Sequence, residues 1–96
     1  MYELRYKPQA RKYFKKINSK GLASAFSNAL TKISADPYNT GTKKSGDLAG
    51  IYCCDVYHDK VNYEIAYRIY KENDSFVVII LAGTRENFYR ELKKYM

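Results

Sequence analysis

The sequence predicts one α+β domain over residues 1–96, with a small, largely antiparallel sheet. We expect an αα-hairpin on one face of the sheet and a helix at the C-terminus, in the order β-α-α-β-β-β-α. Three observations predict this class. The 96 residues, 46% of them hydrophobic, suffice for one core. Two N-terminal segments have apolar residues at helical spacing, and three strand-like segments follow in the C-terminal half.

The N-terminal third predicts one strand and two helices. Residues 2–7, "YELRYK", alternate as a short strand does, and Pro8 suits the first turn of a helix. Residues 18–21 break the helical pattern, which resumes over residues 22–35 and ends before Pro37. Two amphipathic helices joined by so short a connection predict an αα-hairpin. The apolar stripe of the first helix is Ala10, Tyr13, Phe14 and Ile17.

The remaining elements follow a long loop, predicted over residues 37–50. Strands are predicted over residues 51–57, 63–70 and 76–82, and the last of these is apolar on both faces, as a central strand is. The terminal helix is expected to begin near Thr84 or Arg85, with Thr84 as its N-cap. Alternation along 63–70 predicts which side chains share a face. Tyr63, Ile65, Tyr67 and Ile69 should pack on the hairpin, while Glu64, Arg68 and Tyr70 point outward.

The charge points to the class of partner. Seventeen Lys and Arg against ten Asp and Glu give a formal net charge of +7. Such a surface suits a polyanion, either nucleic acid or an acidic protein, although a basic surface can serve solubility alone. No apolar run approaches the roughly 18 residues of a membrane span. We therefore expect no membrane partner, and charges from the third residue onward predict no secretion signal.

The two cysteines, Cys53 and Cys54, are adjacent, so on a strand they point to opposite faces and do not pair with each other. They also lack the spacing of a zinc site. We interpret them as reduced thiols of a cytoplasmic protein, and no metal or organic cofactor is indicated.

Three segments carry a resemblance to a known family. They are "GDLAGIY", "YEIAYRI" and "AGTRENFY", and their order and spacing matter more than any one of them. With them, nearly the whole chain resembles the RelE/ParE toxins of type II bacterial toxin–antitoxin systems. RelE-like members enter the ribosomal A site and cut messenger RNA without a metal, whereas ParE-like members inhibit DNA gyrase by binding. Both are silenced by a cognate antitoxin.

The resemblance implies a messenger-RNA endonuclease that needs the ribosome and is held by an acidic antitoxin. The alternatives are a gyrase inhibitor that does no chemistry, and a toxin-like protein that has lost its activity. By the resemblance, Arg85 holds the scissile phosphate. Tyr89, four residues later on one helix face, stacks on a base or assists proton transfer. Arg68 and Tyr70 on the preceding strand could join them.

The sequence departs from the family where RelE members carry cations. Cys53 and Asp55 stand where they have lysines, and Glu64 stands where they have an arginine. The substitutes we propose from the sequence are His58 as a catalytic group and three lysines as RNA contacts. His58 is the only histidine in the sequence. The lysines are Lys43 and Lys44 in the loop and Lys60 in the turn.

Each of these residues also has a purely structural interpretation. Arg85 could pair with Glu86 or Glu64, and Arg68 with Asp55 or Glu64 across the sheet. Tyr89 could simply pack the terminal helix on the sheet. His58, Lys43, Lys44 and Lys60 could be solvated residues of a turn and a loop.

Overall fold

The computed structural model describes residues 1–71 and 73–96. Its sheet has five strands in the order β1-β5-β4-β3-β2. β1 is parallel to β5, and every other neighbouring pair is antiparallel. The predicted α+β fold is therefore confirmed. The strands are β1 (Glu3–Tyr6), β2 (Thr42–Lys43), β3 (Tyr52–His58), β4 (Val61–Tyr70) and β5 (Phe76–Thr84).

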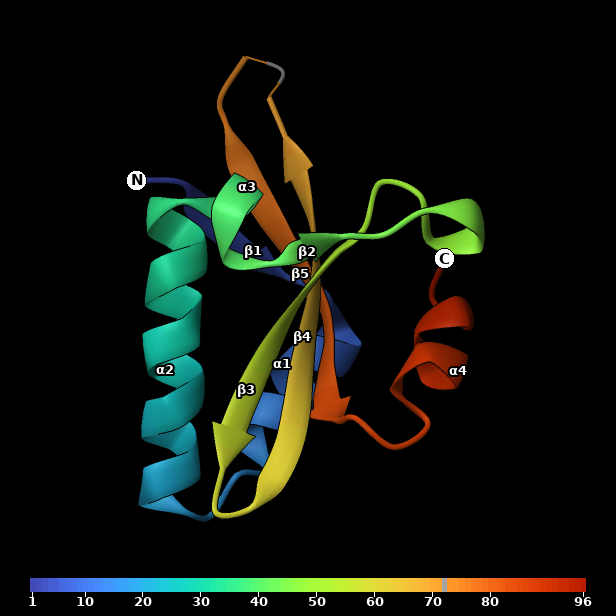
Figure 1. Cartoon of the computed structure of the whole chain (residues 1–96). Helices are drawn as coiled ribbons and strands as arrows, with labels where there is room; N and C mark the ends of the chain where they lie inside the picture. The colour runs from blue at the N-terminus through green and yellow to red at the C-terminus, as the bar shows by residue number, and fades with distance from the viewer. Residues whose placement is uncertain (72) are drawn as a thin grey trace.

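Two helices cover one face of this sheet, and a third lies on the other (Figure 1). The first two are α1 (Pro8–Lys15) and α2 (Lys20–Ala35), and α4 (Phe88–Lys93) follows β5. The helical hairpin and the C-terminal helix are thus both present. Within the described residues, no helix has the length and apolar character that a membrane crossing requires.

Local sequence explains where the long helices begin. Pro8 occupies the first turn of α1, where its missing N–H costs nothing. Ser19 caps α2, because its hydroxyl accepts a hydrogen bond from the Leu22 N–H at 3.1 Å. The cap places the start of α2 two residues before the predicted Leu22. The two helices contact each other through aromatic side chains, and the ring centroids of Phe14 and Phe26 are 5.5 Å apart.

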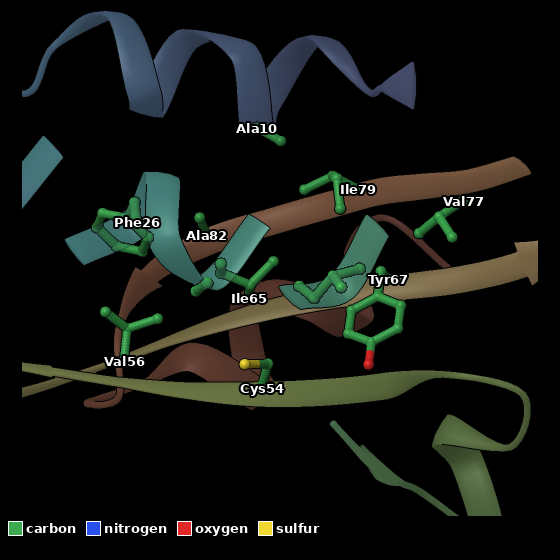
Figure 2. Close-up of a cluster of buried hydrophobic side chains, with 11 residues drawn as sticks. Ala10, Phe26, Cys54, Val56, Ile65, Tyr67, Val77, Ile79 and Ala82 are labelled. Carbon is green, nitrogen blue, oxygen red and sulfur yellow. The ribbon is translucent and has the colours of Figure 1, made fainter. Parts of the chain in front are cut away.

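The core on the helical face is a closed apolar layer, drawn in Figure 2. Tyr67 is fully buried in it, and its hydroxyl donates a 2.7 Å hydrogen bond to the Pro37 carbonyl. The predicted inward set of Tyr63, Ile65, Tyr67 and Ile69 all belong to this layer. The hydrogen bond to Pro37 satisfies the hydroxyl of Tyr67, which is the largest fully buried side chain.

A smaller core lies between the sheet and α4. A β-bulge opposite Ala66 and Tyr67 leaves Ile80 without a partner in the register. Ile80 and Leu81 therefore both face α4, although they are neighbours in sequence. The buried members of this second core are Ile51, Cys53, Ala66, Ile80, Leu81, Phe88 and Leu92.

The structure corrects the predicted loop between the hairpin and the second half of the chain. Residues 37–50 contain α3 (Pro37–Thr40), the edge strand β2 and a 3-10 turn, η1 (Gly46–Leu48). Thr40 stabilises α3, since its hydroxyl donates to the Asp36 carbonyl at 2.7 Å. The edge strand is only two residues long, which is why alternation did not reveal it.

The structure also corrects the start of the terminal helix. Thr84 is still in β5, paired with Tyr63, and α4 begins at Phe88. Asn87 precedes it at φ +62°, a left-handed conformation that Asn tolerates better than most residues. Arg85 therefore lies in the connection between β5 and α4, and the expectation that it shares a helix face with Tyr89 is wrong.

Candidate functional site

The centre of the candidate site is the carboxylate of Glu64 on β4. Glu64 faces α4, and only 2% of its surface is exposed. The Tyr89 hydroxyl donates a 2.8 Å hydrogen bond to Oε1. Arg85 Nε lies 3.8 Å from Oε2, an ion-pair distance without a hydrogen bond. Oε2 is buried and has no hydrogen-bond partner among the described residues, so this carboxylate is only half satisfied.

Backbone contacts place Arg85 and Tyr89 beside Glu64. The Arg85 N–H donates to the Asn62 carbonyl at 2.9 Å, which holds the chain against β4 where it leaves β5. The Phe88 N–H then donates to the Arg85 carbonyl at 3.1 Å, so the chain turns back over the sheet. Phe88 and Leu92 are buried under α4 and fix its orientation. Tyr89 consequently points at Glu64, while the Arg85 side chain remains 60% exposed.

Lys44 completes the cationic side of this site. Its Nζ lies 5.3 Å from the centre of the Tyr89 ring, a cation–π distance. Lys44 follows β2, and its N–H donates to the Ile51 carbonyl at 2.9 Å. Arg85 and Tyr89 thus meet at one buried carboxylate, and Lys44 lies beside the Tyr89 ring, although the three residues come from separate segments.

Burial sets the proton chemistry of the groups next to Glu64. Burial, and then the hydrogen bond to Glu64 and the repulsion from its charge, raise the pKa of Tyr89, which Arg85 opposes. Tyr89 therefore remains protonated at neutral pH and acts as a donor. Burial and the nearby Glu64 raise the pKa of the Cys53 thiol to about 12, so Cys53 is no thiolate nucleophile at neutral pH.

Arg68 and Tyr70 lie on the same face of the sheet, further along β4. The Arg68 guanidinium lies against Gly50, where an added Cβ would sit 2.7 Å from Nη1. Among the described residues Arg68 forms no ion pair, so the alternative pairing with Asp55 or Glu64 does not occur. Tyr70 stacks on Phe76 instead. The structure therefore separates these two from the Glu64 site.

The other proposed RNA contacts lie away from Glu64. Lys43 pairs with Tyr52 in the sheet, and its side chain alternates to the face opposite Lys44. His58 ends β3 with its ring against Gly21 at the start of α2. Asp59 and Lys60 form the two-residue hairpin turn, at φ +51° and +66°. The structure does not gather these residues with Arg85 and Tyr89.

The sequence interpretation missed the role of Glu64 in the site. It placed Glu64 on the face opposite the helical hairpin, which is correct, but it expected the side chain to point outward, whereas α4 covers that face and Tyr89 closes over the carboxylate. The available signal was an acid inside "YEIAYRI", at a position where the resemblance expects an arginine. Within residues 1–71 and 73–96, no three His, Cys, Asp or Glu side chains are grouped as metal ligands.

Comparison with known proteins shows which proteins the chain resembles. No functionally curated protein matches the sequence. The structure resembles the RelBE2 toxin–antitoxin complex from Mycobacterium tuberculosis with a TM-score of 0.67 and 26% identity, over 88% of this chain and 98% of that chain. The isolated E. coli RelE toxin has the same fold, with a TM-score of 0.69 and 17% identity over 100% of both chains.

The match to a family model is more extensive. Residues 4–93 match the ParE-like toxin of type II bacterial toxin–antitoxin systems. This range contains all five strands, except for the first residue of β1. It also contains Glu64, Arg85 and Tyr89. The chain therefore belongs to the ParE-like toxin family of type II bacterial toxin–antitoxin systems.

Proposed function

We propose that this toxin is an endoribonuclease that cuts messenger RNA on the ribosome, in the bacterial cytoplasm, without a metal ion. The observation that carries the proposal is the convergence of Arg85 and Tyr89 on the buried carboxylate of Glu64, with Lys44 beside the Tyr89 ring. A half-satisfied buried carboxylate is costly to fold, and such groups concentrate at functional sites.

Cleavage by the 2′-hydroxyl of the RNA itself needs three things. The hydroxyl must lose its proton, the charge on the phosphorane must be neutralised, and the 5′-oxygen must gain a proton. Arg85 is exposed and cationic, which suits it to neutralise the phosphorane. A hydrogen-bond donor of this kind is typically worth about 10²–10³-fold in rate.

The Tyr89–Glu64 hydrogen bond supplies a route for the first proton. Tyr89 accepts the proton of the 2′-hydroxyl while it passes its own proton to Glu64 Oε1, 2.8 Å away. The phenol stays neutral throughout, which agrees with its raised pKa. This relay also explains how a carboxylate with 2% exposure can act on a substrate that it does not touch.

Lys44 Nζ lies 5.3 Å from the centre of the Tyr89 ring, and it gives a proton to the departing 5′-oxygen. The products are a 2′,3′-cyclic phosphate and a 5′-hydroxyl. Glu64 then holds one additional proton and Lys44 lacks one, so exchange with water restores both groups.

The test is cutting of messenger RNA in a reconstituted translation reaction, read by primer extension. Arg85→Ala should lower the cutting rate by about 10²–10³-fold, and Tyr89→Phe and Glu64→Gln by about 10²–10⁴-fold. Arg90→Ala is the matched control, because Arg90 is an exposed arginine of α4 outside this cluster. Undiminished cutting by Arg85→Ala would refute the proposal.

An acidic antitoxin is the proposed regulatory partner. The net charge of +7 suits such a partner, and the similar RelBE2 structure is a toxin–antitoxin complex. Co-expression with the product of a neighbouring acidic reading frame should restore growth. Survival of the toxin's effect in the presence of every adjacent acidic product would contradict this assignment.

The second candidate is a toxin that inhibits DNA gyrase by binding alone. Cys53, Asp55 and Glu64 favour it, since all three stand where the RelE resemblance expects cations. Purified protein would then block supercoiling while messenger RNA stays intact. Harmless overexpression with both readouts negative would instead identify a toxin fold that has lost its activity.

A further inference from the structure

One part of the sheet surface extends beyond α4. The paired ends of β4 and β5 project past that helix in Figure 1, toward the turn that joins the two strands. On the face that carries Glu64, this part presents Arg5 of β1, Arg68 and Tyr70 of β4, and Phe76 of β5. We call these four residues the Arg68–Tyr70 surface. α1 and α2 pack on the opposite face of the sheet, and the segment around Gly50 borders this surface at Arg68.

Aromatic and guanidinium groups form an ordered stack on this surface. The Phe76 and Tyr70 rings are stacked, with centroids 4.9 Å apart and planes 14° from parallel. Arg5 Cζ lies 3.8 Å from the centre of the Phe76 ring. Glu3 holds Arg5 in place at 3.3 Å. Phe76 is therefore enclosed between Arg5 and Tyr70, while Tyr70 ends the stack and is 40% exposed.

Arg68 stands two residues before Tyr70 on the same strand face. Its guanidinium lies against Gly50, which has φ +89° and no side chain to displace it. Gly50, the second glycine of "GDLAGIY", thus gives Arg68 a defined position beside the aromatic stack. No carboxylate among the described residues pairs with Arg68, so its charge is available to a ligand.

We propose that the Arg68–Tyr70 surface binds single-stranded RNA, with one base stacked on Tyr70 and a phosphate on Arg68. An aromatic ring with a neighbouring cation on an open sheet suits an unpaired base better than an apolar peptide. Tyr70 lies six residues from Glu64 on β4, about 20 Å along the strand. The site is consequently separate from the proposed cleavage site and holds a different part of the strand.

This inference rests on the proposed function only for the identity of the ligand as RNA. Its test is therefore a binding measurement without ribosomes. We would measure the fluorescence anisotropy of a labelled ten-nucleotide single-stranded RNA with the full-length protein, over a series of salt concentrations. The variants are Tyr70→Ala, Tyr70→Phe and Arg68→Gln. Tyr57→Ala is the control, because Tyr57 is a tyrosine on β3 that is 66% exposed.

Stacking on one aromatic ring contributes about 1–3 kcal/mol, so Tyr70→Ala should weaken binding by roughly 5- to 150-fold. Tyr70→Phe keeps the ring and should bind like the wild type. Arg68→Gln should reduce the slope of log affinity against log salt by about 0.7, as the loss of one phosphate contact does. Tyr57→Ala should leave both quantities unchanged.

Equal affinity of Tyr70→Ala and the wild type would overturn the proposal. An equal loss in Tyr57→Ala would also overturn it, since binding would then follow general surface properties. The proposal would also be overturned if the protein bound no RNA at low salt and instead bound a protein partner in a way that depends on Tyr70. If the Tyr70→Ala variant does not fold, the change in salt dependence of RNA binding in Arg68→Gln decides whether the proposal holds. Loss of ribosomal cutting in Arg85→Ala with RNA binding intact separates this site from the proposed chemistry.

Discussion

The two faces of the sheet differ in how completely their buried polar groups are hydrogen-bonded. β4 supplies both examples: Tyr67 on the side of α1 and α2, and Glu64 on the side of α4. The Tyr67 hydroxyl donates to the Pro37 carbonyl at 2.7 Å and is satisfied. Glu64 has one oxygen hydrogen-bonded to Tyr89 and one buried oxygen without a hydrogen-bond partner among the described residues. The buried polar group on the helical face therefore does not reduce stability, whereas the α4 face contains a buried carboxylate whose incomplete hydrogen bonding destabilises the fold.

The difference shows how a small domain can separate folding from function. A 96-residue chain has a limited core, and its stability cannot absorb many unsatisfied groups. Here the larger layer, whose one buried tyrosine hydroxyl is hydrogen-bonded, lies under α1 and α2, while the six-residue helix α4 closes the second face. The cost of Glu64 is thus confined to the face where Arg85, Tyr89 and Lys44 meet.

The largest expected effect is on the helical face. Tyr67→Ala should lower the free energy of unfolding by about 3–5 kcal/mol, because it leaves a cavity in a closed layer. Urea denaturation followed by circular dichroism measures this. Tyr67→Phe is the control and should cost only about 1–2 kcal/mol, since it keeps the ring and leaves the Pro37 carbonyl unpaired. A loss below 1 kcal/mol for the alanine variant would break the comparison.

The second effect tests how closely that layer is packed. A Cβ at Gly41 would lie 2.5 Å from the Tyr67 hydroxyl and 3.0 Å from the Cys53 carbonyl oxygen. Gly41→Ala should therefore cost about 1–3 kcal/mol in the same denaturation experiment. Adding Tyr67→Phe removes the shortest of these contacts, the one with the Tyr67 hydroxyl. The double variant should then lose less than the sum of the single losses, and strict additivity would contradict direct contact.

The third effect has the opposite sign and belongs to the α4 face. Glu64→Met replaces the half-satisfied carboxylate by an apolar side chain of similar length. It should raise the free energy of unfolding by about 1 kcal/mol, because removing a buried carboxylate that has one oxygen without a hydrogen bond outweighs the loss of the Tyr89 hydrogen bond and the exposed Arg85 ion pair. The same variant should lose toxicity. A drop in stability greater than about 1.5 kcal/mol would show that the carboxylate stabilises α4, and the contrast between the faces would fail.

Sequence patterns predicted the fold well because its main signals are local. Alternation along residues 63–70 assigned Tyr63, Ile65, Tyr67 and Ile69 to the helical face, as the structure confirms. Helical spacing and the break before Pro37 placed α1 and α2 within two residues of their observed bounds. These features depend on neighbours in sequence, which is why they were readable.

The site was less predictable because it depends on contacts between distant segments. Whether Glu64 is exposed depends on where α4 lies, and the bulge at Ile80 that supports α4 has no sequence signature here. Lys43 and Lys44 looked equivalent until the two-residue strand β2 assigned them to opposite faces. The resemblance did identify Arg85 and Tyr89, but it could not indicate that both meet a carboxylate.

The smallest effect tests how tightly the α4 face is closed, through the response of Cys53 to alkaline pH. Burial and Glu64 raise the pKa of Cys53 from 9.0 to about 12 in the folded protein. Below pH 9 both the folded and unfolded thiols keep their protons, so the contribution of Cys53 to stability is complete there. As the pH rises toward 12, the unfolded thiol ionises first, and stability falls. Between pH 8 and 10 the wild type should lose about 1 kcal/mol more than Cys53→Ala in urea denaturation. Parallel profiles for the two proteins would mean that Cys53 is not shielded from water on this face, and that α4 does not close over the carboxylate as tightly as the contrast requires.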